Sequence, residues 1–123
     1  MAWNLDTDRP IYAQLVDRIK MQIVSGQYPP GGRLPSVREL AAVAAVNPNT
    51  MQKAFAELER GGLIVTQRTT GRTVTLDEER LQSVREGLAK EHVEQFFRQM
   101  RELGYTEADA EELLKKRYEE EKE

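Results

Sequence analysis

Apolar and polar positions recur along this chain with a helical period in several short segments. In the first segment, apolar residues occupy every fourth position: Ile11, Leu15, Ile19 and Ile23. This spacing places them on one face of a helix. We expect Asp8 to cap that helix and Pro10 to lie in its first turn. Gly26 ends the pattern, so the first helix is predicted over about residues 10–25.

Two more helices are predicted between residues 36 and 60. Ser36 is followed three positions later by Glu39, a capping box that satisfies two backbone donors at a helix start. Asn47 followed by Pro48 indicates the start of a third helix, which Gly61 ends. About three residues separate the second and third helices, a spacing typical of a helix-turn-helix.

β-Branched residues then form two runs, 63–66 and 73–76, on either side of residues 68–72. Gly71 in the intervening loop can adopt a positive φ, which favours a hairpin. Three helices followed by a hairpin predict a winged helix-turn-helix over residues 1–76.

Residues 77–123 have a different pattern, with a long apolar stripe at helical spacing. Its members are Leu81, Val84, Leu88, Val93, Phe96, Phe97, Met100 and Leu103. Gly104 ends this helix, and Thr106 with Asp109 can cap another that carries Leu113 and Leu114. We expect the acidic residues after Tyr118 to fray. The predicted fold class is therefore mainly α with a small β-hairpin, a winged helix-turn-helix followed by a C-terminal pair of helices.

Charge is distributed unevenly between these two regions. The 123 residues carry a net charge of −3. Residues 1–76 hold nine Lys and Arg against six Asp and Glu, a balance of +3, whereas residues 77–123 hold nine against fifteen, a balance of −6. The chain is thus predicted to join a mildly basic module to an acidic one.

Composition excludes several kinds of chemistry. The chain has no Cys and a single histidine, His92. Disulfides, thiolate metal sites and cysteine nucleophiles are therefore excluded, and one His cannot form a multi-histidine metal site. No Gly-rich phosphate loop lies between a strand and a helix. We expect no metal, no cofactor and no enzymatic activity, and for His92 an exposed polar role rather than pH sensing.

No segment predicts contact with a membrane. The longest apolar run, 40–46, is far shorter than the roughly 20 residues that cross a bilayer. The first residues lack the basic and apolar regions of a signal peptide. A cytoplasmic protein is the expectation.

The third helix carries the features that point to a function. Its apolar residues share one side and should face the core: Met51, Ala54, Phe55 and Leu58. The opposite side presents Asn49 and Lys53, flanked by Thr50 and Gln52. Amide and ammonium groups can bind base edges in the major groove, so this face predicts DNA recognition. The alternative is a polar face that only contacts solvent.

Basic residues around this helix are candidate phosphate ligands. Ser36 and Arg38 lie at the start of the second helix, where backbone N–H groups favour an anion. Arg72 near the hairpin tip suits a minor groove or a phosphate, or else only keeps the tip soluble. The full set of candidate DNA contacts is Arg33, Ser36, Arg38, Asn47, Asn49, Thr50, Gln52, Lys53, Arg68, Gly71 and Arg72.

Four runs of sequence resemble a known family. They are PIYAQL (10–15), PGGRLPSVRELA (30–41), VNPNTMQKAF (46–55) and LERGGLI (58–64). Together they resemble the GntR family of bacterial transcription regulators over residues 9–76. The resemblance implies a winged helix that binds operator DNA as a homodimer, with Arg38 and the start of the third helix on the DNA.

Two departures from most members refine this resemblance. Only 47 residues follow the wing, which is similar to the YtrA subfamily, whose short C-terminal region serves dimerisation. The family's wing usually has two glycines, whereas this chain has only Gly71, followed by Arg72. We therefore expect the wing backbone to approach DNA less closely than in most members, and Arg72 to contact DNA through its side chain.

The acidic region is predicted to form a homodimer. Two short helices cannot bury its apolar stripe, and a two-fold dimer matches a palindromic operator. An effector pocket between protomers at Phe96 and Phe97 is the alternative, and the effector is unidentified. For the whole chain, the predicted function is a transcription regulator, acting as a repressor on double-stranded operator DNA. A winged-helix protein–protein adaptor is the competing function.

Overall fold

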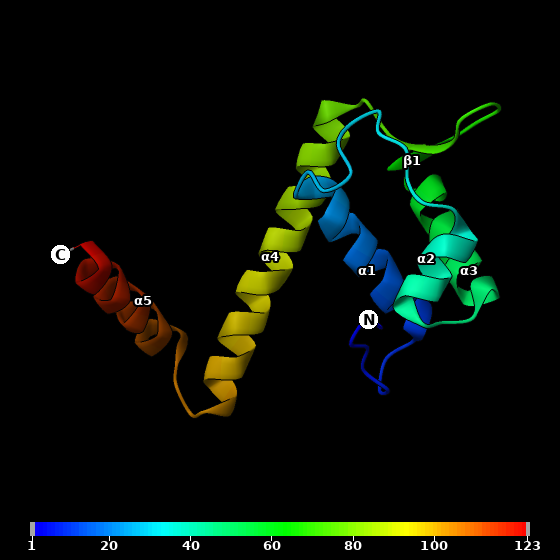
Figure 1. Cartoon of the computed structure of the whole chain (residues 1–123). Helices are drawn as coiled ribbons and strands as arrows, with labels where there is room; N and C mark the ends of the chain where they lie inside the picture. The colour runs from blue at the N-terminus through cyan, green and yellow to red at the C-terminus, as the bar shows by residue number, and fades with distance from the viewer. Residues whose placement is uncertain (1, 123) are drawn as a thin grey trace. The chain divides into compact units, whose positions relative to one another are not determined.

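A computed structural model describes residues 2–122 as five helices and one two-stranded hairpin (Figure 1). In chain order the elements are α1 (Ile11–Val24), α2 (Val37–Ala44), α3 (Pro48–Arg60), β1 (Ile64–Gln67), β2 (Gly71–Val74), α4 (Glu78–Glu102) and α5 (Glu107–Lys122). This order confirms the predicted fold class. Internal contacts divide the chain into two compact units, an N-terminal unit (Met1–Arg85) and a C-terminal unit (Glu86–Glu123).

The core of the N-terminal unit joins α1, α2, α3 and the hairpin. The predicted stripe of α1 is buried, and Leu15 and Ile19 are fully enclosed. From α3, Met51 and Phe55 meet them with no exposed surface. A close-packed apolar core therefore holds the helix-turn-helix in one arrangement.

The start of α1 differs from the prediction. Pro10 is the N-cap, no side chain caps the helix, and Asp8 does not take that role. Instead the buried Gln14 side chain holds the preceding segment. Its Oε1 accepts from the Asp6 N–H at 2.7 Å, and its Nε2 donates to the carbonyls of Asp6 and Arg9 at 2.8 and 3.0 Å. A long side chain folded back onto the chain thus replaces a local cap.

The helix-turn-helix has the predicted caps. Ser36 Oγ accepts from the Glu39 N–H at 3.1 Å, and a Glu39 carboxylate oxygen accepts from the Ser36 N–H at 3.4 Å. Asn47 Oδ1 accepts from the Asn49 N–H at 2.8 Å at the start of α3. Between the helices, Ala45 adopts the left-handed conformation, with φ 60° and ψ 48°. This residue reverses the chain within a short turn.

The wing is the antiparallel pair β1–β2, closed by the loop 68–70. Gly71 pairs with Gln67 at the last register position and has a φ of +79°, which only glycine adopts at little cost. Residues 31–34 run along the other edge of β2. The Gly31 N–H donates to the Val74 carbonyl and the Leu34 N–H to the Arg72 carbonyl, each at 2.9 Å. The loop before α2 therefore braces the base of the wing.

The first turns of α4 belong to the N-terminal unit. Leu81 is only 4% exposed in its core, and Val84 packs against that core. Arg80 and Arg85 donate to the carbonyls of Gly61 and Val24, both at 2.9 Å. Leu81 and Val84 were predicted to lie in a dimer interface. The structure corrects this prediction for Leu81, whose side chain is buried inside the chain, whereas Val84 is half-buried and its place in the interface stays a prediction.

The C-terminal unit contains the rest of α4 and all of α5. Gly104 ends α4, and α5 begins at the predicted capping box. There Thr106 Oγ1 accepts from the Asp109 N–H at 3.1 Å, and the Thr106 N–H donates to Asp109 Oδ2 at 3.0 Å. The helix then continues to Lys122, so the predicted fraying after Tyr118 is wrong. An i,i+4 ion pair between Arg117 and Glu121, at 3.4 Å, supports this last part.

Candidate nucleic-acid interface

The outer face of α3 is accessible, as the sequence predicted. Asn49, Gln52 and Lys53 are exposed, whereas the opposite side of the helix is buried. Lys53 Nζ lies 4.0 Å from the centre of the Tyr12 ring of α1, a cation–π contact. The side chain of Lys53 is therefore held at one edge of this face. The structure thus places two side-chain amides and one ammonium group on the same exposed surface.

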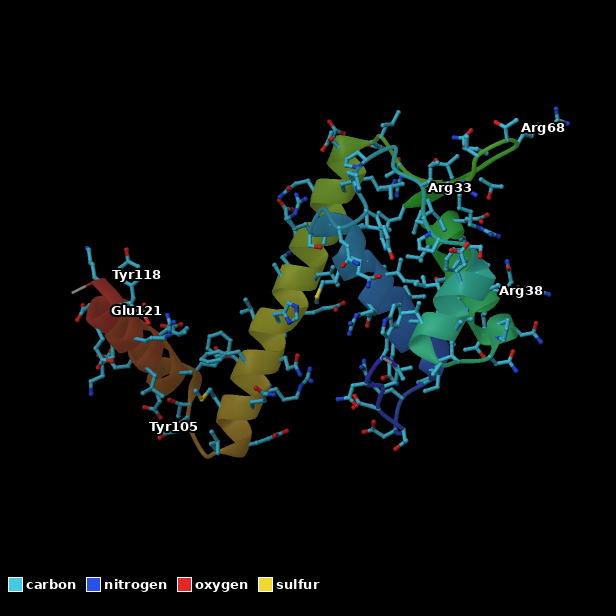
Figure 2. All side chains as sticks on the ribbon, viewed as in Figure 1. Arg33, Arg38, Arg68, Tyr105, Tyr118 and Glu121 are labelled. Carbon is cyan, nitrogen blue, oxygen red and sulfur yellow. The ribbon has the colours of Figure 1, made fainter. Side chains whose placement is uncertain are left out.

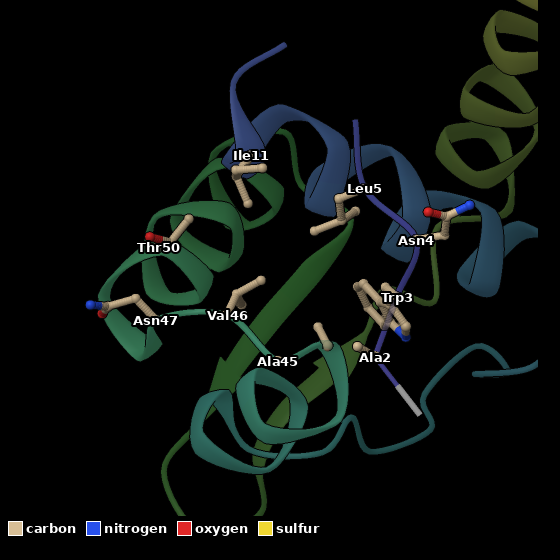
Figure 3. Close-up of a pocket in the computed structure, with 10 residues that line it drawn as sticks. Ala2, Trp3, Asn4, Leu5, Ile11, Ala45, Val46, Asn47 and Thr50 are labelled. Atoms are coloured by element: carbon tan, nitrogen blue, oxygen red, sulfur yellow. The ribbon is translucent and has the colours of Figure 1, made fainter. Parts of the chain in front are cut away.

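Two other predicted contacts lie toward a cavity. Asn47 and Thr50 help to line a hollow of about 470 Å³ beside the start of α3. The N-terminal segment, with Trp3 and Leu5, and the turn before α3, with Val46, line its sides (Figure 3). Thr50 is half-buried, and the side-chain Oδ1 of Asn47 accepts the capping hydrogen bond from the Asn49 N–H. These two residues are thus less available than Asn49 and Gln52.

Three of the predicted phosphate contacts are exposed arginines of the N-terminal unit. Arg38 follows the capped start of α2, Arg33 lies in the loop that braces β2, and Arg68 lies at the wing tip. All three are exposed and extend toward the same side of the N-terminal unit (Figure 2). A Cβ placed on Gly71 would lie 3.8 Å from Arg33 Nε, so Arg33 sits against the wing. This arrangement suits phosphates that flank a groove.

Arg72 does not point to the wing tip. Its Nε donates to Glu59 Oε1 of α3 at 2.6 Å, and its guanidinium carbon lies 5.3 Å from the centre of the Phe55 ring. The side chain is 26% exposed. The structure therefore places the Arg72 side chain against α3.

Glu59 is the partner that the sequence analysis missed. Besides Arg72, its Oε1 accepts from the Thr66 hydroxyl at 3.0 Å. The hydrogen bond from Arg72 holds the pKa of the Glu59 carboxyl below its usual value, against the opposing effect of partial burial. The sequence did contain a signal for this ion pair. Glu59 lies one helical turn after the buried Phe55, and the hairpin that follows carries Arg72.

Apolar side chains remain accessible on the C-terminal unit. Of the predicted dimer residues in this unit, the most exposed are Val93 at 52%, Leu103 at 72%, Leu113 at 40% and Leu114 at 45%. Leu88, Phe96, Phe97 and Met100 are half-buried. Phe96 and Phe97 contact each other edge to face, with ring centres 5.3 Å apart. Tyr105 and Tyr118, which are not among the predicted dimer residues, are also exposed. The polar residue His92 is exposed as well.

Within residues 2–122, no helix combines the length and the apolar character that crossing a bilayer requires. Over the same range, no group of three or more His, Cys, Asp or Glu side chains is arranged to hold a metal ion.

Comparison with known proteins confirms the resemblance. The family model described as bacterial regulatory proteins, gntR family, matches residues 11–74. The chain is 38% identical to the uncharacterised HTH-type transcriptional regulator YhcF of Bacillus subtilis, over 91% of this chain and 93% of YhcF. It is 50% identical to the HTH-type transcriptional repressor YtrA of the same organism, over 50% of this chain and 48% of YtrA.

Solved structures agree with these relatives. A GntR family transcriptional regulator from Listeria monocytogenes is similar with a TM-score of 0.79 and 41% identity. The match covers 91% of this chain and 98% of the Listeria chain. The similarity thus includes the helices after the wing as well as the winged helix.

Proposed function

This chain belongs to the GntR family of bacterial transcriptional regulators, with a DNA-binding winged helix-turn-helix, and we propose that it represses transcription as a homodimer on an inverted-repeat operator. The observation that carries the proposal is the exposed outer face of α3, in a unit that also exposes Arg33, Arg38 and Arg68. The similarity to the repressor YtrA supports the sign of regulation. We propose a binding protein without enzymatic activity.

Each group of the interface has a separate proposed role. Asn49 and Gln52 can pair with adenine edges in the major groove, and Lys53 with guanine. Arg38 and the start of α2 bind a backbone phosphate, since both N–H groups and a guanidinium favour an anion there. Arg33 and Arg68 add phosphate contacts from the loop and the wing.

The accessible apolar residues of the C-terminal unit support the homodimer. Side chains such as Leu103 and Leu114 lose contact with water when a second copy covers them, which stabilises the dimer. A two-fold dimer presents two copies of α3 to one face of DNA. Half-sites should then be centred about 34–36 Å apart, or a multiple of that distance.

Gel-shift titration at several salt concentrations tests the proposed function. A duplex bound by the wild-type protein should lose affinity steeply as salt rises, because bound phosphates release counterions. Asn49→Ala and Gln52→Ala should each change preference at particular base pairs, by about 1–3 kcal/mol per lost bidentate contact. If neither substitution alters base preference, the assignment of the outer face is wrong. A protein–protein adaptor would give no specific shift at any concentration.

A further inference from the structure

We propose that Glu59, Arg72 and Thr66 form a latch that fixes the wing against α3, and that Arg72 is a positioning residue rather than a DNA contact. The proposal rests on the proposed function, because it concerns how the wing is held for DNA.

Register places the two wing residues of the latch side by side. Thr66 of β1 and Arg72 of β2 are direct partners in the antiparallel pair. Directly paired residues project from the same face of a hairpin. Both side chains reach the same atom, Glu59 Oε1, at 3.0 Å from Thr66 and 2.6 Å from Arg72. One carboxylate oxygen of α3 therefore holds both strands of the wing.

Partial burial makes this contact stronger than an ordinary surface ion pair. The Arg72 and Glu59 side chains are 26% and 34% exposed, whereas the ion pairs of Arg9 with Asp6 and of Arg117 with Glu121 have side chains more than half exposed. The Arg72 guanidinium also lies over the ring of Phe55, whose side chain is fully buried. A charge-assisted hydrogen bond above a fixed aromatic ring restricts the arginine to one position.

The latch lies next to the part of the wing that is proposed to contact DNA. Only the pair Gln67–Gly71 separates Thr66 and Arg72 from the loop 68–70, which carries Arg68. The latch therefore fixes the direction in which that loop projects from the wing, relative to α3. The contacts of Arg72 with Glu59 and with the Phe55 ring hold its side chain against α3. Holding the loop is the role that its observed contacts support.

Salt dependence of DNA binding separates a positioning role from a contact. We would measure Kd against salt on a duplex that the wild-type chain selects from a random library, for Glu59→Gln, Arg72→Gln and the double variant. Each single variant should weaken binding by about three- to fivefold, which is the most that the loss of a partly exposed ion pair can cost when the pair only holds the wing in position. The double variant should be no weaker than either single one, because both remove the same contact. Arg72→Gln should leave the slope of log K against log salt unchanged.

Arg68→Gln is the matched control, since it removes the same charge from the wing tip. It should reduce the magnitude of the salt slope by about 0.9, as expected for one lost phosphate contact. The latch is refuted if Arg72→Gln lowers the slope as Arg68→Gln does. It is also refuted if Glu59→Gln leaves binding unchanged or strengthens it, because an arginine released from Glu59 would then bind DNA itself.

Hydrogen exchange in the DNA-free protein tests the latch independently of the proposed function. Amides of residues 66–74 should exchange faster in Glu59→Gln and in Arg72→Gln, and at the wild-type rate in Arg68→Gln. Arg72→Lys, which keeps the charge, should restore part of the protection. Unchanged exchange in the two latch variants would overturn the proposal even if the protein binds DNA. Faster exchange in a chain that binds no DNA would support the latch and reject the proposed function.

Discussion

The two units of this chain differ in how far they bury their apolar side chains. In the N-terminal unit, three helices and the wing enclose a continuous core, and Phe55 and Leu15 have no exposed surface. In the described part of the C-terminal unit, residues 86–122, Ala110 alone reaches that degree of burial, while Leu103 and Leu114 are exposed at 72% and 45%. The N-terminal unit therefore has its own apolar core within one chain. The C-terminal unit exposes an apolar surface of the kind that a partner protein covers.

Charge follows the same division. The basic and amide groups proposed to bind DNA lie on the N-terminal unit, where a finished core fixes their positions. Acidic residues dominate the C-terminal unit and would repel DNA phosphates. The proposed DNA contacts and the proposed dimer contacts lie on different units, so we expect substitutions to alter DNA binding and dimerisation separately.

The largest expected effect is on the core of the N-terminal unit. Phe55→Ala should lower the free energy of unfolding by about 3–5 kcal/mol, because it leaves a cavity beneath the wing and α1. Fluorescence of Trp3, which packs against this core, can follow unfolding in urea. The loss should not depend on protein concentration. A loss of less than about 1 kcal/mol relative to wild type would contradict the burial of Phe55 in this core.

The next effect is on pairing of the C-terminal units. Phe96→Asp should weaken dimerisation by at least about a hundredfold, or 2.7 kcal/mol, because it places a carboxylate in the apolar interface. Sedimentation at micromolar concentration should then give monomers. Met21→Asp is the control, since Met21 is exposed at 44% on the N-terminal unit and should leave the dimer intact. A Phe96→Asp protein that still sediments as a dimer would refute the proposed interface.

A smaller effect is expected on DNA binding at the N-terminal unit. Arg38→Ala should weaken binding to all sequences about tenfold, with a salt slope reduced by about 1, if Arg38 holds a phosphate. Arg98→Ala removes the same charge from the C-terminal unit and should change neither quantity. Equal losses for the two variants would mean that net charge, rather than position on the N-terminal unit, governs binding.

The smallest effect is the pH dependence of the latch. The folded-state pKa of Glu59 is lowered, so the stability from this ion pair is present above the unfolded-state pKa near 4.3. It is lost as pH falls through the folded value. Glu59→Gln should therefore be less stable than wild type at pH 7, by less than about 1 kcal/mol, and the difference should shrink at pH 3. Urea unfolding at the two pH values measures it, and a constant difference would contradict the ionised pair.

Local patterns explain which parts of the fold the sequence predicts. The capping boxes at Ser36 and Thr106 and the cap at Asn47 depend on residues two or three positions apart, and all three form as predicted. The buried face of α3 follows from helical spacing alone. Asp8 fails as a cap because Gln14, a residue within the helix, binds the preceding backbone instead.

Contacts that depend on the twist of the hairpin or on helix continuity could not be predicted in this way. Arg72 meets Glu59 across thirteen positions only because the wing folds back over the end of α3. Leu81 and Val84 share one helical stripe with the apolar residues that follow, yet they pack on the core of the N-terminal unit. Periodicity identifies the apolar face of α4. It does not show where along the helix that face stops packing on the core of the N-terminal unit.

Selection of bound DNA from a random library is the sharpest test of dimeric binding to an inverted repeat, because the result depends on both units at once. We predict enrichment of an inverted repeat whose half-sites are centred about 10–10.5 base pairs apart, or a multiple of that spacing, in register with a two-fold dimer. The same selection with Phe96→Asp should lose the fixed spacing. Enrichment of one unpaired motif by the wild-type chain, or no enrichment at all, would contradict the account.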